Sequence, residues 1–339
     1  MKAFIRFCCL PLLLLGSLTA SAQIPLPAQR AAALSQKLRT LILPELTFQD
    51  ATLEEAIEFL RLKCAQIDST ADPSKRGINI VLLGRSKAKL SLQLKNTPVS
   101  EALRYITELT GRGYIVEPYA IVIGGKNFKS TNPPPRLIAT HGIEAQAQNI
   151  LLPSVQFQKA SPEEACEYMR LKRSDVDPPR PMPNIVLKAP DPFSKRQLSL
   201  DLKNIPQSEA LRYIAELSGL HLRYQAEAVL LSQREDDLGK IELLGKATEK
   251  LRADKIILPL AQFQNATLEE VATFVRIKSA EADPAKNGIN IIIAPGTDLQ
   301  AACSLDVRHI RASEMLRYAA GLMDLKISAD DHAFTISAK

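Results

Sequence analysis

The seven residues SEALRYI, which run from Ser100 to Ile106, return letter for letter from Ser208 to Ile214, and a variant, SEMLRYA, runs from Ser313 to Ala319. The segments around this phrase also recur, in the same order each time. One phenylalanine per copy marks the period, at positions 48, 157 and 263. A period of this length is that of a small domain rather than of a short solenoid repeat. The sequence therefore predicts three copies of one module.

Each block of the repeat predicts one element. In the first copy, ILPELTF (42–48) alternates in hydrophobicity as a strand does. Thr52, with Glu55 three residues later, predicts a helix that begins with a capping box. The later blocks are a buried strand, an alternating strand, the helix of the opening phrase and a closing hairpin, at residues 78–82, 90–94, 100–110 and 114–123.

This block order predicts the α+β class: three tandem small β-α-β-β-α-β(β) modules, each with two helices packed on a small mixed sheet. The expected boundaries are a leader at 1–22, modules at 37–125, 144–233 and 251–339, and linkers at 126–143 and 234–250. We expect both linkers to lie outside the common core, KSTNPPPR (129–136) to be stiff and extended, and a short helix to form within 246–255.

The third copy departs from the other two at two positions. Asp324 stands where Gly111 and Gly219 supply the C-cap of the second helix. Arg311 replaces the proline that precedes this helix in the other copies. We therefore expect the second helix of the third module to end less cleanly.

The N-terminus has the features of a secretory signal peptide. Lys2 and Arg6 precede the apolar run FCCLPLLLLGSL, and Ala20-Ser21-Ala22 supplies the small-x-small pattern of a cleavage site. The run is too short to span a bilayer comfortably, which disfavours a membrane anchor. We expect a mature chain that begins near Gln23, is periplasmic or secreted, and has no transmembrane segment.

Charge and aromatic content argue against nucleic acid as a partner. The formal net charge is +6, and the basic residues are interleaved with acidic ones. The chain has no Trp, and Phe and Tyr are sparse. A nucleic-acid-binding surface would instead show a basic stripe with stacking aromatic side chains.

Three cysteines follow the leader: Cys64, Cys166 and Cys303. An odd number cannot form a closed disulfide framework. Cys166 and Cys303 fall at apolar positions of the repeat, so we expect small buried side chains. Cys64 matches Arg173 and Ser279 of the other copies, so we expect it to be partly exposed.

No repeated residue predicts catalysis or metal binding. The doublet Glu54-Glu55 recurs, but it lies in the first turn of a helix, where negative charge suits the dipole and adjacent side chains point apart. The pair Asp72-Pro73, which recurs at 177–178 and 283–284, lacks the spacing of a calcium loop, and we interpret it as an Asx-type turn. The sequence has no HExxH, paired CxxC, GxSxG or Walker motif. We expect no cofactor and no enzyme activity.

The opening phrase predicts an amphipathic helix with two interpretations. Ala102, Ile106 and Leu109 share its apolar face, and Arg104 lies opposite, between two glutamates, as in an exposed charge ladder. Alternatively, the arginine and a half-buried tyrosine form a docking face, because both residue types are favoured at protein interfaces. The candidate partner-binding residues of this face are Arg104, Tyr105, Arg212, Tyr213, Arg317 and Tyr318.

The closing hairpins suggest a second binding mode. They end in AIVI (120–123), AVLL (228–231) and AFTI (333–336), which are short, apolar and without inward charge, as is typical of an open sheet edge. A partner strand would add to such an edge, which makes Val122 and Leu230 further candidate partner-binding residues. The alternatives are a hairpin covered by the neighbouring module and a solvated edge.

The repeat resembles a known domain family. The motifs F-x-x-A-x-x-E-E-A, N-I-V, L-x-L-x-L-K-N-x-P-x-S-E-A-L and T-G-x-x-Y-x-V-E-x-x-A-I-V-I are similar to those of the secretin and TonB short N-terminal domain. The resemblance covers all three modules. It implies a periplasmic domain that contacts proteins, at the entry end of a secretin channel or as the signalling domain of a TonB-dependent receptor, with no catalytic residues to carry over.

Together these features favour an exported, non-enzymatic interaction or scaffold protein of the cell envelope. Its expected partners are envelope proteins, such as secretin or outer-membrane receptor components. An accessory role in a secretion, uptake or signalling complex stays open. So does a hydrolase or cell-wall-modifying enzyme, which a single deep pocket lined by unlike residues from two modules would favour.

Overall fold

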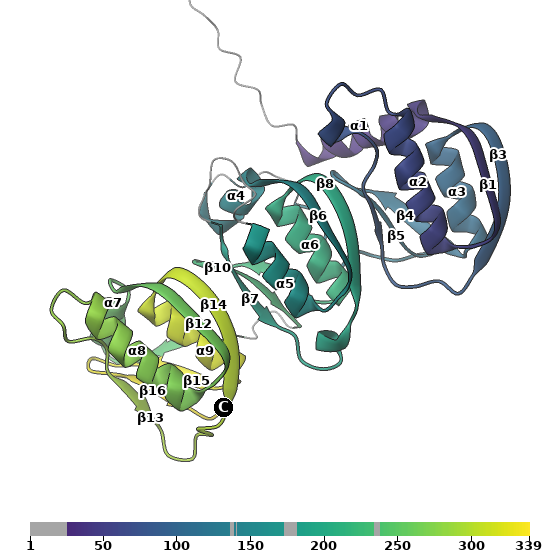
Figure 1. Ribbon diagram of the computed structural model, residues 1–339. Coiled ribbons are helices and arrows are strands. Elements are labelled where there is room, and N and C mark those ends of the chain that lie inside the picture. Colours follow the sequence, from purple (N-terminus) through teal and green to yellow (C-terminus); the bar gives the residue numbers. More distant parts are fainter. Residues whose placement is uncertain (1–25, 136–138, 140, 173–181, 234–237) are drawn as a thin grey trace, which may run out of the picture.

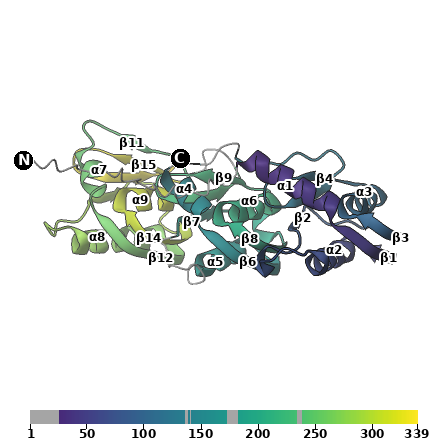
Figure 2. The same ribbon diagram turned by 90° about the horizontal axis from the view of Figure 1, so that it is seen from above.

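The computed structural model describes residues 26–135, 139, 141–172, 182–233 and 238–339. Within these ranges it shows three modules in a row, in chain order, so that the second contacts both the first and the third (Figure 1, Figure 2). The chain is of the α+β class, as the sequence predicts. We call the contact between modules 1 and 2 the first junction and the contact between modules 2 and 3 the second junction.

Module 1 shows the strand arrangement that the others repeat. The strands β1 (Ile42–Thr52) and β3 (Lys89–Pro98) pair antiparallel in a two-stranded ribbon. A separate three-stranded sheet has the order β2 (Ile80–Leu82), β5 (Ile121–Gly125), β4 (Arg112–Val116). Because β2 is parallel to β5 and β4 is antiparallel to it, this sheet is mixed, as predicted.

Two helices, α2 (Leu53–Ile67) and α3 (Val99–Leu109), complete module 1 and share a core with the ribbon and the sheet. The predicted capping box begins α2: the Glu55 N–H donates to Thr52 Oγ1, and the Thr52 N–H donates to the Glu55 carboxylate at 2.8 Å. These two bonds satisfy main-chain donors that the first turn of a helix leaves without a partner.

Modules 2 and 3 repeat the same elements. In module 2 these are β6 (Leu151–Ala160), α5 (Pro162–Leu171), β7 (Asn184–Lys188), β8 (Leu198–Pro206), α6 (Gln207–Ser218), β9 (His221–Tyr224) and β10 (Ala228–Ser232). In module 3 these are β12 (Ile257–Thr267), α8 (Leu268–Ala282), β13 (Ile291–Ile293), β14 (Ala302–Arg311), α9 (Ala312–Leu322), β15 (Lys326–Ala329) and β16 (Phe334–Ser337).

A further helix precedes the first strand of each module: α1 (Pro27–Thr40), α4 (Gly142–Asn149) and α7 (Thr248–Ala253). The helix expected within 246–255 is therefore confirmed, and the expected module starts at 37, 144 and 251 fall inside helices. The segment 234–250 was predicted to lie outside the common core, and its strand is an addition that only module 3 shows among the described residues. Its strand β11 (Ile241–Leu243) pairs parallel with β15 and widens the sheet of module 3.

A kink bends each ribbon at the same place and explains a repeated serine. The first ribbon strands have one residue in the left-handed region, with φ of 52°, 53° and 51° at Asp50, Lys159 and Asn265. The N–H of each donates to a serine hydroxyl of the partner strand, at 2.9 to 3.0 Å. This bond gives a partner to a main-chain donor that the kink removes from the ribbon.

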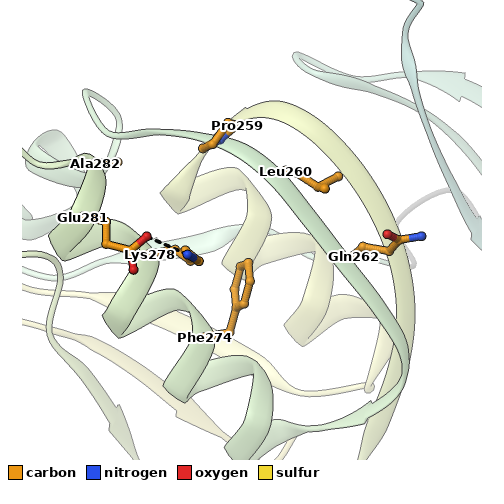
Figure 3. Close-up of a pocket in the computed structure, with 7 residues that line it drawn as sticks. All are labelled: Pro259, Leu260, Gln262, Phe274, Lys278, Glu281 and Ala282. Atoms are coloured by element: carbon orange, nitrogen blue, oxygen red, sulfur yellow. Dashed lines mark hydrogen bonds and ion pairs between the residues drawn. The ribbon is translucent and has the colours of Figure 1, made fainter.

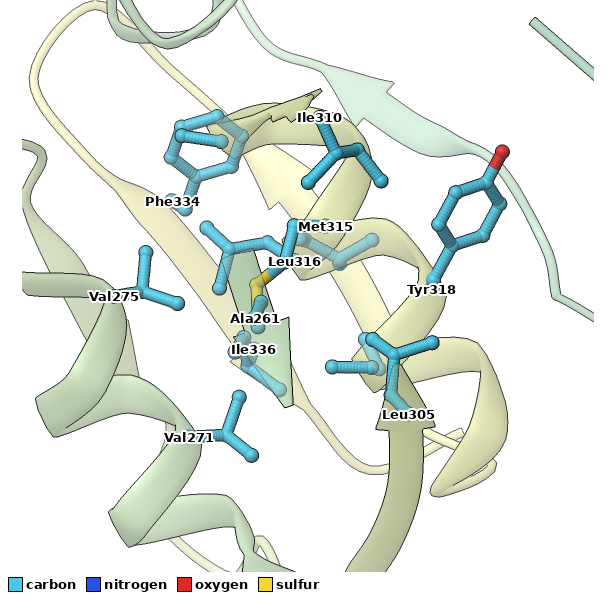
Figure 4. Packing of buried hydrophobic residues seen from close by; sticks show 14 of the residues in the cluster. Ala261, Val271, Val275, Leu305, Ile310, Met315, Leu316, Tyr318, Phe334 and Ile336 are labelled. Atoms are coloured by element: carbon cyan, nitrogen blue, oxygen red, sulfur yellow. The ribbon is translucent and has the colours of Figure 1, made fainter. Parts of the chain in front are cut away.

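The cores are aliphatic, with one aromatic pair per module. Phe48 meets Phe59 edge to face, and modules 2 and 3 repeat this pair. Figure 4 shows the core of module 3, where Met315 and Leu316 of α9 face Val271 of α8. Such close packing of helices against strands is expected where apolar residues recur at helical spacing.

Each module buries one cysteine thiol. Cys166 and Cys303 are buried, as predicted. Cys64 is also buried, with 0 % exposure, so the expectation of partial exposure is wrong. Burial raises the pKa of each thiol to about 12. The thiols are therefore protonated and unreactive in the folded chain.

The second helices differ from the prediction at two points. Leu109, which was predicted on the buried face of α3, is 52 % exposed, and Thr107 is buried instead. The buried face of α3 is therefore rotated about the helix axis from the predicted one. The less clean helix end expected in module 3 is also wrong. Asp324 takes the left-handed conformation (φ 59°), and the Leu325 N–H caps the Ala320 carbonyl, as the Leu220 N–H caps Ala215 in module 2.

An aspartate side chain organises the loop that follows α2 in module 1 and α8 in module 3. In module 1 an Asx turn that was not predicted forms at Asp68, whose carboxylate accepts from the N–H of Thr70 at 3.0 Å and from that of Gly77 at 2.8 Å. In module 3 Asp283 forms the predicted turn. The pair at 177–178 lies outside the described residues.

Asp68→Asn should destabilise module 1 by about 2 kcal/mol at pH 7. Burial opposes ionisation of Asp68, but hydrogen bonds from Lys37, Thr70 and Gly77 outweigh it and hold its pKa below the usual range. The lowered pKa adds stability that is fully present above about pH 4, the usual pKa of an unfolded aspartate, and is lost as pH falls through the folded pKa. The stability of the Asp68→Asn variant should therefore depend less on pH in acid.

The measurement is alkylation of the three buried thiols in rising urea, since each thiol reports the opening of one module. The labelling midpoint of Cys64 should fall, with smaller shifts at Cys166 and Cys303. Asp50→Asn is the matched control, because the Asp50–Lys89 ion pair of module 1 lies on the exposed surface and is worth about 0–1 kcal/mol. Equal shifts for the two variants would contradict the assignment.

Candidate functional site

The two faces of each three-stranded sheet pack into different modules. In β5, Ile121 and Ile123 belong to the core of module 1, whereas Val122 belongs to the core of module 2. In the same way Leu230 of β10 belongs to the core of module 3. Val122 is 1 % exposed and Leu230 is fully buried. Strand alternation therefore gives each sheet one face for its own module and one for the next.

The prediction of an open edge at the closing hairpins is wrong. Their last strands, β5, β10 and β16, are interior strands that pair on both sides. Besides its hairpin partner, each of these strands pairs in parallel with a short strand that lies about 40 residues earlier in the chain. These short strands are β2, β7 and β13. Val122 and Leu230 consequently have no free edge for strand addition, and their side chains are covered by the next module.

One asparagine makes the polar centre of each junction. The Asn79 side chain accepts from the Lys203 N–H at 2.9 Å and donates to the Lys203 carbonyl at 3.1 Å. Asn184 makes the same pair of bonds with Arg308, at 2.8 and 3.0 Å. We call this contact the asparagine clamp. Because the clamp binds main chain, the side chain of the contacted residue is not part of it.

The docking face of the opening phrase lies inside the first junction. The Arg212 guanidinium pairs with Glu117 of module 1 and with Glu209 of its own helix, and it donates to the Asn132 carbonyl at 2.9 Å. It also lies over the Tyr213 ring, 4.2 Å from the centroid. The Arg212 and Glu117 side chains are each 4 % exposed. Removing Arg212 would leave two buried carboxylates, Glu117 and Glu209, without their counter-charge.

The second junction uses the same face with a neutral partner. Arg317 donates to the Gln225 side chain of module 2 at 2.6 Å and to the Gly239 carbonyl at 3.2 Å. Tyr318 is fully buried, as is Tyr213. Four of the six candidate residues of the docking face therefore contact other parts of the same chain.

The two departures of module 3 from the repeat both serve the second junction. The Arg311 N–H donates to Glu227 of module 2 at 2.8 Å, and its guanidinium pairs with the same carboxylate. The Asp324 carboxylate pairs with Lys188 of module 2 at 2.7 Å. Charged contacts thus replace the proline and the glycine of the other modules.

The same docking face is exposed on module 1. Arg104 pairs with Glu101 and Glu108 of its own helix, and its side chain is 41 % exposed, against 4 % for Arg212. Its guanidinium lies over the half-buried Tyr105 ring, 4.1 Å from the centroid. The exposed charge ladder of the first interpretation is therefore correct for module 1 alone. We call this surface, which consists of Lys95, Glu101, Arg104 and Tyr105, the head.

The outer sheet face of module 3 is exposed in turn. Ile292 is 52 % exposed, whereas its equivalents Val81 and Val186 are each 1 % exposed inside the junctions. Asn290 donates to the His332 carbonyl, as Asn79 does to that of Tyr119. We call this surface the tail. It consists of Asn290, Ile292, Asp330, His332 and Thr335.

A pocket of about 490 Å³ lies at the first junction, between α1, α2 and residues 201–204 of module 2. It meets part of the criterion for an enzyme, because two modules line it. Two of its basic side chains are occupied: Lys37 pairs with Asp68, and Arg61 pairs with Glu58 and donates to the Ile80 carbonyl. Among the residues that the structure describes, no histidine, cysteine, serine or threonine lines it.

A second pocket lies on module 3, between β12 and α8 (Figure 3). Its wall carries the Phe274 ring and the paired side chains of Lys278 and Glu281. The described residues hold no group of three or more His, Cys, Asp or Glu side chains that could bind a metal ion. Neither pocket thus brings together a recognisable set of catalytic groups.

Comparison of the chain with protein-family models, with curated proteins and with solved structures finds no match. In the described part of the chain, no helix is both long enough and apolar enough to cross a membrane. The assignment to the secretin and TonB short N-terminal domain therefore stays a prediction.

The functional residues that the sequence reasoning missed are the clamp asparagines and Glu117. A signal for the asparagines was present, since Asn79, Asn184 and Asn290 share one position directly before a buried strand. A polar residue kept at that place in all three copies calls for a hydrogen-bonding role. Glu117 carried no such signal, because the other copies have Gln225 and Asp330 there.

Asn184→Ala should weaken the second junction, and Asn290→Ala is its matched control. Both changes remove one bond within a module, but only Asn184→Ala also removes the two bonds of a clamp. The difference in free energy of unfolding should be about 2 kcal/mol. It would appear as a larger fall in the labelling midpoint of Cys166 in the Asn184→Ala variant than of Cys303 in the Asn290→Ala variant, since each thiol reports the module that carries the substitution. Equal labelling in both variants would show that the clamp contributes nothing.

Proposed function

We propose that the chain is an exported, non-enzymatic interaction and scaffold protein of the cell envelope, and that its head is a protein-docking surface. One observation carries the proposal. The helix face that module 1 exposes is the face that buries Arg212 and Arg317 against neighbouring modules. The resemblance to the secretin and TonB short N-terminal domain supports the same class of function.

The chemistry of the head suits a protein partner. Arginine and tyrosine are enriched where interfaces derive most of their binding energy, and here the guanidinium is already stacked on the ring. In the junctions the partner groups are an acidic or amide side chain for the arginine and an asparagine for the main chain. A partner of the head is expected to present the same groups beside an apolar surface.

Such a scaffold would hold its binding surfaces at a fixed spacing. Each junction combines apolar burial with directed hydrogen bonds, so the modules stack in one orientation rather than act as independent beads. Components of a secretin-type secretion complex or of a TonB-linked uptake and signalling complex are the partners that the resemblance suggests.

A photo-crosslinking amino acid at position 105 should form an adduct with a protein in the intact cell envelope. Position 251 is the control, because Leu251 is 59 % exposed on α7, away from the head. Arg104→Glu should reduce the adduct at least tenfold, since it removes the charge that the partner pairs with. Adduct formation that is no stronger at 105 than at 251 would refute the docking surface.

Export gives a separate test. The purified mature chain should begin near Gln23 and should be released with the periplasmic fraction or the medium, because the leader carries a small-x-small cleavage pattern. The measurements are N-terminal sequencing and cell fractionation. Recovery of the chain from the cytoplasm with Met1 or Lys2 at its N-terminus would remove the basis for an envelope role.

A further inference from the structure

We infer that the partner of the head is the tail of a second copy of this chain, so that copies join end to end as the modules do. The inference rests on the proposed function and names the partner at the same site. The two junctions inside the chain supply the template, because they repeat one geometry with different side chains.

The main-chain part of the template is present at both ends. Lys95 lies opposite Glu45 in the ribbon of module 1, at the register that Lys203 and Arg308 occupy in the other modules. Asn290 already makes the bond within its module that positions Asn79 and Asn184. A clamp from Asn290 to the Lys95 main chain of a second copy would therefore need no rearrangement of the asparagine.

The charges at the two ends are complementary. Asp330 occupies the position of Glu117 and Gln225, the residues that bind the arginine of the next module. It accepts hydrogen bonds from the N–H groups of His332 and Ala333, so its carboxylate is fixed at the tail. In an end-to-end contact the Asp330 carboxylate would face the Arg104 guanidinium of the head, so that opposite charges meet.

The apolar part of the template is also present, in a reduced form. Ile292 is exposed at the centre of the tail, where valine is buried in both junctions. Thr335 takes the place of Val122 and Leu230, which lowers the apolar area of the tail. The contact between copies should therefore be weaker than the junctions, which are also helped by the high effective concentration of linked modules.

The symmetry of such a contact is distinctive. Head and tail are different surfaces, so the contact is heterologous and leaves a free head and a free tail on every open assembly. Growth beyond a dimer follows, into a ring if the rotation closes and into a filament if it does not. A two-fold symmetric dimer, by contrast, would stop at two copies.

Sedimentation velocity of the purified chain over a concentration series tests this inference. The weight-average mass should rise with concentration past two copies, and added salt should reduce the association, because one contact is an ion pair. Arg104→Glu blocks the head, and Ile292→Asp blocks the tail. Each variant alone should weaken association at least tenfold, and both should keep the thiol-labelling profile of the folded chain.

The decisive experiment is a mixture of the two blocked variants. Only one productive contact remains, between the free head of the Ile292→Asp chain and the free tail of the Arg104→Glu chain, so the mixture should form dimers and stop. A matched control, Leu251→Asp, should associate like the natural chain. A monomer at all concentrations, unaffected association in the blocked variants, or a mixture without dimers would each overturn the inference.

The outcome separates this inference from the proposed function. If position 105 crosslinks to a different envelope protein while the purified chain stays monomeric, the docking surface stands and the second copy is wrong as its partner. If position 105 gives no specific adduct in the envelope, the docking surface itself fails.

Discussion

The structure depends on the burial of a second apolar face on each three-stranded sheet. The helices of one module cover one face, and the other face has no cover within that module. A small module buries only a modest core, so an uncovered apolar face is costly, as in other tandem repeats. The next module provides the cover. Apolar burial has no direction, and the asparagine clamp with the buried arginine supplies the orientation.

The two junctions reach the same geometry with different chemistry. In the first, Arg212 and Glu117 form a buried ion pair, whose desolvation offsets much of its attraction. In the second, Gln225 is a neutral partner, and the charged contacts lie at the margins, where Arg311 and Asp324 reach module 2. The backbone pattern is therefore the constant part of the junction, and the side chains around it vary.

The features that the sequence predicted correctly depend on neighbouring residues, and those that it missed depend on segments that are distant in the chain. Strands and capping boxes followed from spacing within a few residues. The interior place of β5 did not, because its partner β2 lies about 40 residues away, and the phase of α3 was wrong at Leu109. The same phrase places Arg104 in solvent and Arg212 in a junction. The phrase alone could predict the face but not what covers it.

The clamp also bears on how such a chain changes length by gene duplication and deletion. Because the clamp asparagine bonds only to main-chain atoms, it can bind any module that has the same ribbon, whatever side chain occupies the position of Lys203 or Arg308. A descendant that lost the middle unit would set Arg317 against Glu117 in place of Gln225, exchanging a neutral contact for an ionic one. The number of units is thus a trait that recombination can alter one step at a time, without a new interface having to evolve.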